Sequence, residues 1–336
     1  MLSTLRDKPV ALGFLAAAKK LVSALQTAVG WVGFCLLRSS ERLVPTTVLS
    51  ILLRPPAAVF DLMRVRQRKL VPCWRRFPKS WRPKPGRFFL HQGLGLCHAR
   101  LLYTWPDRLC TPRWLNRCRL EGGRDFTGDK GVVLASLHFG PFETLPYWLR
   151  AHGIVTTMIR GAAPPASLQS LAYYQYRLSE PAEIPIFILA SELAPVPRFA
   201  RVSSLLGPGR RLLVTVDADR GLQMKLPLEN RTFRMATGAI RLAAMAGADL
   251  VPCLITETGW WKFALHFGAP VPGEYLGDSP NLKAAGTHLL TEFSKVISRY
   301  PEQCRLRLLA AISPELGEAH VTPESQIMGK TSLSDM

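Results

Sequence analysis

Short apolar segments rich in β-branched residues alternate with helical stretches along residues 119–313. Each segment is bounded by glycine, proline or a helical pattern, as buried strands usually are. The predicted strands are Gly131–Leu137, Ile154–Ile159, Ile184–Leu189, Arg211–Val216, Asp249–Ile255 and Lys262–Phe267. Strands that alternate with helices form a largely parallel sheet. The pattern therefore predicts an α/β fold, with a mixed, largely parallel sheet flanked by helices.

An uncharged apolar run occupies Leu21–Leu37, with Lys19 and Lys20 before it and Arg38 after it. Its length lies at the lower edge of the roughly 17–25 residues that span a bilayer. No small-residue cleavage site follows, so the run is not typical of a secretory signal. We expect an N-terminal membrane-associated helix, which either anchors the protein or lies in the interface.

Composition divides the chain into four regions. Residues 1–63 are predicted to be an apolar, membrane-associated helical region, and residues 64–118 a basic collar with a helix. Residues 119–313 form the α/β core, and residues 314–336 are a polar tail that we expect to be disordered. The collar begins with Arg64–Arg87, which contains ten basic and no acidic residues.

The charge balance predicts anionic partners. Lys and Arg number 43 against 24 Asp and Glu, which gives a formal net charge of +19. An anionic membrane surface, an acidic carrier protein and nucleic acid are all compatible with this charge. The seven cysteines include no C-x-x-C pair, which argues against a zinc site or a disulfide framework. We interpret them as reduced thiols in a cytoplasmic setting, and we expect no metal site.

The strongest candidate for catalysis is His138, which directly follows the predicted strand Gly131–Leu137. Open α/β sheets place their sites at this end of a strand. Gly140 permits a tight turn, and Glu143 then falls in the first turn of the next helix. An imidazole with a carboxylate on its other nitrogen can act as a general base in acyl transfer. The alternative is that His138 caps the helix and Glu143 is an ordinary first-turn carboxylate.

Five segments of the chain together resemble one known family. They are Leu43–Pro45, Leu137–Glu143, Val214–Gly221 (V-T-V-D-A-D-R-G), Ala236–Pro252 (A-T-G-A…A-G-A-D-L-V-P) and Ile297–Gln303 (I-S-R-Y-P-E-Q). In this order they are similar to the lauroyl/myristoyl acyltransferases of lipid A biosynthesis, a branch of the H-x₄-D/E lysophospholipid acyltransferase superfamily. The resemblance covers most of the chain.

The resemblance implies an acyl-carrier-protein or coenzyme A thioester as donor, a lipid or glycolipid hydroxyl as acceptor, and no bound cofactor. It implies that His138 is the general base, that Glu143 is its partner, and that Arg160 orients substrate or binds an anion. Backbone amides near Gly140 or a basic side chain would stabilise the oxyanion. The implied location is the cytoplasmic face of the inner membrane.

Asp217, Asp219 and Arg220 follow the predicted strand Arg211–Val216, where they could hold the acceptor or position Arg160. An ordinary surface turn is the alternative for Asp-x-Asp-Arg-Gly. The family's W-x-W-x-H-R-R block after P-E-Q is absent, and Cys304–Leu309 (C-R-L-R-L-L) stands there instead. A lysophospholipid or another acceptor that is not lipid A is therefore a second possibility.

A third possibility is a basic protein without catalytic activity, which binds membrane or nucleic acid through Arg64–Arg87. We expect no nucleic acid partner, and the absence of G-x-S-x-G excludes a nucleophile-elbow hydrolase.

Overall fold

The computed structural model describes residues 44–45, 48, 51–52, 70–92, 109, 111–123, 129–160, 185–188, 200–217, 221–259, 261–277 and 280–314. The predicted apolar helix at Leu21–Leu37 lies outside these residues, as does the tail after Pro314. Among the helices that the structure describes, none combines the length and apolar character that a bilayer crossing requires.

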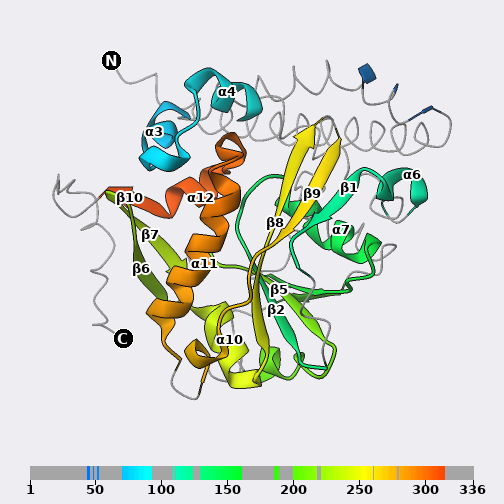
Figure 1. The fold of residues 1–336 in the computed structure, drawn as a ribbon, viewed down its shortest axis with the longest axis vertical. Coiled ribbons are helices and arrows are strands. Elements are labelled where there is room, and N and C mark those ends of the chain that lie inside the picture. Colours follow the sequence, from blue (N-terminus) through cyan, green and yellow to red (C-terminus); the bar gives the residue numbers. More distant parts are fainter. Residues whose placement is uncertain are drawn as a thin grey trace, which may run out of the picture.

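A seven-stranded sheet forms the centre of the molecule, with strand order β1-β9-β8-β2-β5-β3-β4 (Figure 1). Its strands are β1 (Cys118–Glu121), β2 (Val132–Ser136), β3 (Thr157–Arg160), β4 (Ile186–Ile188), β5 (Arg211–Thr215), β8 (Asp249–Gly259) and β9 (Lys262–Phe267). Neighbouring strands are parallel except for the antiparallel pair β8 and β9. The predicted mixed, largely parallel sheet is confirmed, and all six predicted strands are present.

Both faces of this sheet are covered. Along β2, Val133 and Ala135 belong to one apolar core, whereas Val132 and Leu134 belong to a second. The first core contains residues of the helices α10 (Gly238–Ala246) and α11 (Leu282–Ile297), and the second contains residues of α7 (Leu145–Ala151). Two covered faces explain why β2 is a continuous apolar run, without the alternation of a strand that faces water on one side.

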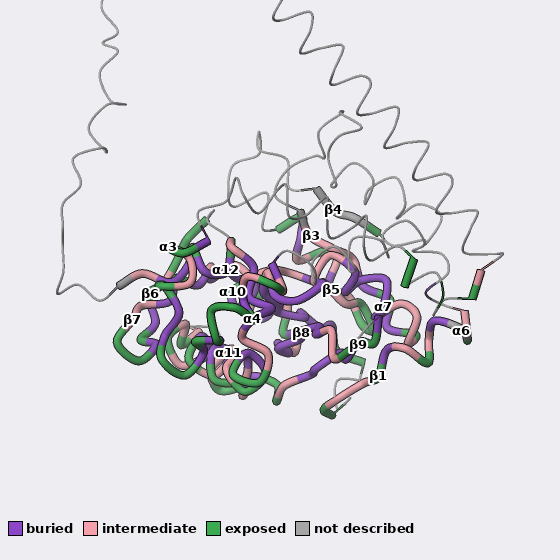
Figure 2. The backbone as a smooth tube through the Cα atoms, turned by 90° about the horizontal axis from the view of Figure 1, so that it is seen from above, coloured by how far each residue is buried: buried purple, intermediate pink, exposed green. Residues whose placement is uncertain are grey.

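Burial follows this layered arrangement (Figure 2). Buried positions are concentrated along the central strands, and exposed positions lie on the outer side of α11 and of β6 and β7. The described residues also form the short helices η1 (Lys79–Trp81), α6 (Pro112–Leu115), η4 (Phe142–Thr144), η5 (Gly273–Tyr275), η6 (Pro301–Gln303) and α12 (Leu306–Ala310).

A second, three-stranded antiparallel sheet was not predicted from the sequence. It has the order β10-β7-β6 and consists of β6 (Gln223–Leu228), β7 (Arg231–Ala236) and β10 (Ile312–Pro314). β6 contains Pro227, which cannot donate a backbone hydrogen bond, but as an edge strand β6 tolerates it. β1 was also missed, because its four residues are too short for a clear pattern.

The described part of the basic collar packs directly onto the α/β core. It includes α3 (Leu70–Arg75) and α4 (Pro85–Leu90), and Phe77, Trp81 and Phe88 are fully or almost fully buried in the first apolar core. Glu229, in the turn between β6 and β7, accepts hydrogen bonds from the backbone N–H groups of Lys79 and Ser80 at 2.6 and 2.9 Å. The collar tryptophan Trp81 is therefore a core residue.

Candidate active site

His138 lies where the C-terminal end of β2 meets the C-terminal segment of the described chain. The backbone N–H of Gly140 donates to the carbonyl of Gln303 at 2.9 Å, and that of Arg305 donates to the carbonyl of His138 at 3.2 Å. Phe139 and Cys304 form an isolated antiparallel bridge between these hydrogen bonds. The turn after β2 is therefore held by backbone pairing to residues more than 160 positions later.

Gly140 is required by the geometry of this turn. Its φ is 55°, and a Cβ atom there would lie 2.2 Å from the carbonyl oxygen of Ile255. The Gln303 side chain ties the same turn to β8 through two hydrogen bonds. Its Oε1 accepts from the backbone N–H of Glu257 at 2.9 Å, and its Nε2 donates to the carbonyl of Glu257 at 2.8 Å. The predicted tight turn at Gly140 is confirmed, and its cause is the close approach of β8.

Asp217 holds the imidazole of His138. The Asp217 Oδ1 atom lies 2.8 Å from His138 Nδ1, and Oδ2 accepts the backbone N–H of His138 at 3.0 Å. The Asp217 side chain is 0% exposed and that of His138 is 13% exposed. An ionised carboxylate only accepts hydrogen bonds, so Nδ1 carries the proton and Nε2 carries the lone pair. This tautomer is the one that can remove a proton from a substrate.

The sheet topology explains how His138 and Asp217, which are 79 positions apart in the sequence, come into contact. β2 and β5 are adjacent and parallel, with Ser136 opposite Thr215, and Val216 N donates to the carbonyl of Ser136 at 2.8 Å. The residues that follow the two strands therefore emerge together at one edge of the sheet. This is the site position expected for an open α/β sheet.

The Glu143 carboxylate, which the sequence predicted to be the partner of His138, pairs with Arg305. The sequence assigned Glu143 as the carboxylate on the imidazole, whereas Asp217 occupies that position and a Glu143 oxygen accepts from the Arg305 guanidinium. The strand order, with β5 beside β2, brings Asp217 to the Nδ1 atom of His138.

Three backbone N–H groups of this turn already have acceptors. The N–H groups of His138, Phe139 and Gly140 donate to Asp217, to the carbonyl of Leu137 and to the carbonyl of Gln303, respectively. They therefore cannot also donate to a developing oxyanion.

The other predicted site residues are described only in part. Arg160 is the last residue of β3, which is parallel to β5, so its backbone lies at the same sheet edge as His138 and Asp217. Its side chain is not described, and Asp219 and Arg220 lie outside the described residues.

Sequence reasoning missed two residues of this site, Gln303 and Arg305. Gln303 was noted only as part of the P-E-Q motif, and Arg305 only as a departure from the family. The P-E-Q motif was the one local signal that marked this segment.

Cys304 lies beside the site but is unsuited to nucleophilic attack. Burial, followed by the nearby carboxylates of Glu302 and Asp217, raises the pKa of its thiol well above the ordinary value. A thiol attacks as the thiolate, which this environment disfavours. The four described cysteines, Cys73, Cys118, Cys253 and Cys304, are all free thiols.

A buried histidine, His266, connects three strands on the other side of β8. Its Nδ1 lies 2.9 Å from a carboxylate oxygen of Glu121, and its Nε2 lies 2.8 Å from the hydroxyl of Thr256. Burial lowers the pKa of His266, an effect that Glu121 opposes and Arg299 reinforces. Thr256 is fully buried, and this group joins β1, β8 and β9.

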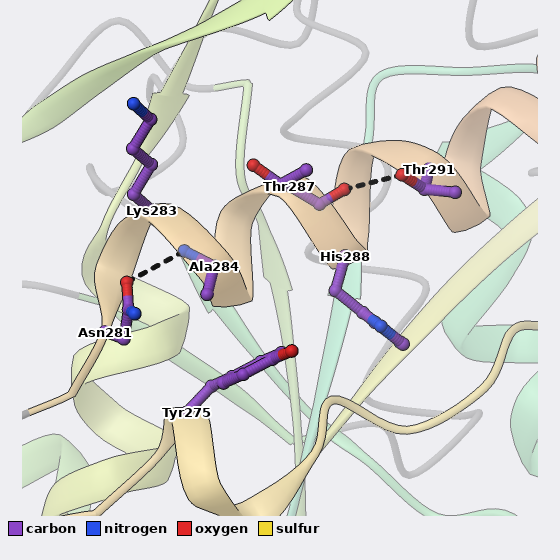
Figure 3. A pocket seen from close by; sticks show the side chains of 7 residues that line it. All are labelled: Tyr275, Asn281, Lys283, Ala284, Thr287, His288 and Thr291. Carbon is purple, nitrogen blue, oxygen red and sulfur yellow. Dashed lines mark hydrogen bonds between the residues drawn. The ribbon is translucent and has the colours of Figure 1, made fainter.

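Within the described residues, no group of three His, Cys, Asp or Glu side chains is placed to hold a metal ion. An open surface hollow of about 510 Å³ lies over the first half of α11 (Figure 3). Lys283, Thr287, His288 and Tyr275 line it, and none of the predicted site residues does.

Comparison with known proteins adds little to the geometry. No protein-family model and no curated protein matches the sequence. The chain is similar to the crystal structure of the 1-acyl-sn-glycerophosphate acyltransferase PlsC from Thermotoga maritima, with 14% sequence identity and a TM-score of 0.35. The match covers 81% of this chain and 95% of the other. At this level of similarity we base no argument on it.

Proposed function

We propose that this protein is an acyltransferase that moves a fatty acyl group from an acyl thioester to a hydroxyl of a lipid or glycolipid. The donor is an acyl-carrier-protein or coenzyme A thioester, and a lipid A precursor is the acceptor class that the sequence resemblance favours. No bound cofactor takes part, because the thioester is a cosubstrate.

The observation that carries the proposal is the pair formed by His138 and Asp217. A buried carboxylate 2.8 Å from Nδ1 of a partly exposed imidazole, at the C-terminal edge of a largely parallel sheet, is suited to general base catalysis. The additional bond from His138 N to Asp217 fixes the carboxylate relative to the ring.

In the proposed reaction, His138 Nε2 removes the proton from the acceptor hydroxyl as its oxygen attacks the thioester carbonyl. Asp217 stabilises the imidazolium that forms. The tetrahedral intermediate then collapses, the carbon–sulfur bond breaks, and the imidazolium returns the proton to the leaving thiolate. The products are an ester and a free thiol, and no acyl-enzyme is formed.

The negative oxygen of the tetrahedral intermediate requires a positive partner. We assign this role to a basic side chain, because the amides of residues 138–140 are already used. Arg160 is the candidate, since its backbone lies at the same edge of the sheet. Asp219 and Arg220 are proposed to hold the acceptor.

We further propose that the protein works on the cytoplasmic face of the inner membrane. The described collar exposes Arg75, Arg76, Lys79, Arg82 and Lys84, and such a surface is attracted to anionic headgroups. An acidic carrier protein would be attracted by the same charges.

The test is transfer of labelled acyl groups, from carrier-protein and coenzyme A thioesters, into a panel of lipid acceptors, with products identified by mass. The panel contains lipid A precursors and lysophospholipids. Acylated lipid made by the unmodified protein but not by folded His138→Ala supports the proposal and identifies the acceptor. Equal traces from both proteins, or no product from well-folded protein across the panel, would favour a binding role and overturn it.

A further inference from the structure

Arg305 is a buried cation beside the proposed reaction centre. Its side chain is 9% exposed, and its guanidinium is paired with Glu143, which is 16% exposed. The sequence gives no local signal for this pair, because the two residues are 162 positions apart. Removing two charges from water is costly, so a buried pair of this kind adds little net stability compared with apolar residues of the same volume.

The Arg305 side chain also contacts the aromatic ring that lies against His138. Its Cζ atom lies 5.5 Å from the centre of the Phe142 ring. The Phe142 ring in turn meets the imidazole edge to face, with 4.4 Å between ring centres. Arg305 therefore fixes both Phe142 and Glu143, the two side chains that follow the Gly140 turn.

The main chain of Arg305 holds the same turn from the other side. Its N–H donates to the carbonyl of His138 at 3.2 Å, and Cys304 is bridged to Phe139. Arg305 thus contacts the turn through its backbone N–H and through its guanidinium, which pairs with Glu143 and lies against the Phe142 ring. The guanidinium suits this combination, because it can bond a carboxylate and stack on a ring at the same time.

From these contacts we propose that Arg305 is a positioning residue: it holds Glu143 and Phe142 so that the imidazole of His138, bound to Asp217, keeps the orientation needed for proton transfer. The inference rests on the proposed function for its kinetic consequence. The geometric part concerns the orientation of His138 and can be tested without turnover.

The kinetic test compares Arg305→Gln, Arg305→Lys, Glu143→Gln and the double variant Arg305→Gln/Glu143→Gln. We expect Arg305→Gln to lower kcat by about 10- to 100-fold, because small misplacement of catalytic groups has effects of this size. KM for donor and acceptor should change less than about threefold. Arg305→Lys should lie between Arg305→Gln and the unmodified protein, since it keeps the charge and loses the planar fork.

The double variant should have a kcat no lower than that of Arg305→Gln, because the effects of substituting two residues that act as one unit do not add. The matched control is Arg307→Gln, an exposed arginine in α12, the short helix that begins directly after Arg305, and it should keep full kcat. Additive losses in the double variant, or unchanged kcat in folded Arg305→Gln, would overturn the proposal. If Arg305→Gln does not fold, Arg305→Lys and Glu143→Gln carry the test.

A spectroscopic measurement separates this inference from the proposed function. The imidazole resonances of ¹⁵N-histidine-labelled protein are assigned to His138 by their loss in His138→Gln. Arg305→Gln and Glu143→Gln should shift the His138 resonances, and Arg307→Gln should not. Shifted resonances in a protein that transfers no acyl group would refute the function while supporting the positioning role. Resonances that Arg305→Gln leaves unmoved would refute the positioning role even in an active enzyme.

Discussion

At the scale of single residues, Asp217 is the group that determines the tautomer of His138. Its carboxylate is fully buried and binds both the ring and the backbone of that histidine. We expect Asp217→Asn to lower kcat by about 10³- to 10⁴-fold, because an amide can donate to Nδ1 and stabilise the wrong tautomer.

Glu143→Gln should have a smaller effect, since Glu143 acts through Arg305 and Phe142. The measurement is kcat for both variants at saturating thioester, with circular dichroism as the check on folding. A larger loss in Glu143→Gln than in Asp217→Asn would contradict the assignment of Asp217 as the partner of His138.

Gly140 allows a second prediction at this scale. Gly140→Ala adds the strain of a left-handed backbone and a clash with the carbonyl of Ile255, whereas Gly153→Ala adds only the strain. Gly153 has a φ of 76° and open space where a Cβ would lie. The strain alone costs about 1–2 kcal/mol, so denaturant unfolding should show this loss for Gly153→Ala and a larger loss for Gly140→Ala. Equal free energies of unfolding would contradict the close approach of β8 to this turn.

At the scale of elements, the collar helix α4 is connected to the site through η6. Gln92, just after α4, is 1% exposed and donates to the carbonyls of Cys304 and Glu302 at 2.9 and 3.4 Å. Arg87, within α4, pairs with Glu302 at 2.9 Å. Because Cys304 is bridged to Phe139, the collar supports the segment on which His138 stands.

Gln92→Ala should therefore destabilise the protein by about 1–3 kcal/mol, since it leaves the buried Cys304 carbonyl without its side-chain donor. Lys84→Gln, an exposed change at the start of α4, is the control and should leave stability nearly unchanged. Denaturant unfolding measures both. A Gln92→Ala protein as stable as Lys84→Gln would show that collar and core are not joined by this contact.

His266 makes the joint between β1, β8 and β9 sensitive to pH. Burial lowers its pKa below the ordinary value of 6.5, so below that pH the unfolded chain binds more protons than the folded protein. His266 therefore contributes stability that is present above pH 6.5 and is lost as the pH falls through its lower folded-state pKa. Each unit by which folding lowers the pKa corresponds to about 1.4 kcal/mol.

His266→Gln should flatten the fall in the free energy of unfolding between about pH 7 and pH 5, relative to the unmodified protein. Glu121→Gln should steepen the fall, because Glu121 opposes the lowering of the His266 pKa. Identical pH profiles for all three proteins would show that His266 is not the titrating group.

At the scale of the whole molecule, we expect the positive charge of the exposed collar to attract an anionic membrane surface. The triple change Arg75→Gln, Arg76→Gln and Lys84→Gln removes charge from the exposed collar. Each basic residue near an anionic surface contributes about 1 kcal/mol, so affinity for vesicles with anionic lipid should fall by roughly 10- to 100-fold.

The matched control removes the same charge elsewhere, at the exposed residues Lys225, Arg241 and Lys283. It should weaken vesicle binding less than the collar triple does, and the difference should shrink as salt is raised. Equal weakening by the two triples would mean that net charge alone governs binding. Loss of duplex DNA binding in the collar triple without loss of vesicle binding would favour the nucleic acid alternative.

The sequence by itself determined the properties that depend on neighbouring residues. The apolar runs placed six strands of the main sheet, and along β2 the run is continuous because both faces are covered. The same reasoning placed His138 at the end of β2 and Gly140 in a tight turn. The edge strand β6 was missed because its exposed side chains and Pro227 remove the pattern of a buried strand.

Only the tertiary structure decided which side chains meet. Asp217 replaced Glu143 at the imidazole because β5 lies beside β2, and Arg305 reached Glu143 because η6 returns to the same edge. Packing likewise places Trp81 in the apolar core. Such contacts depend on strand order and on the return of distant segments, and no local pattern encodes either, because the separations involved exceed the range of helical or strand periodicity.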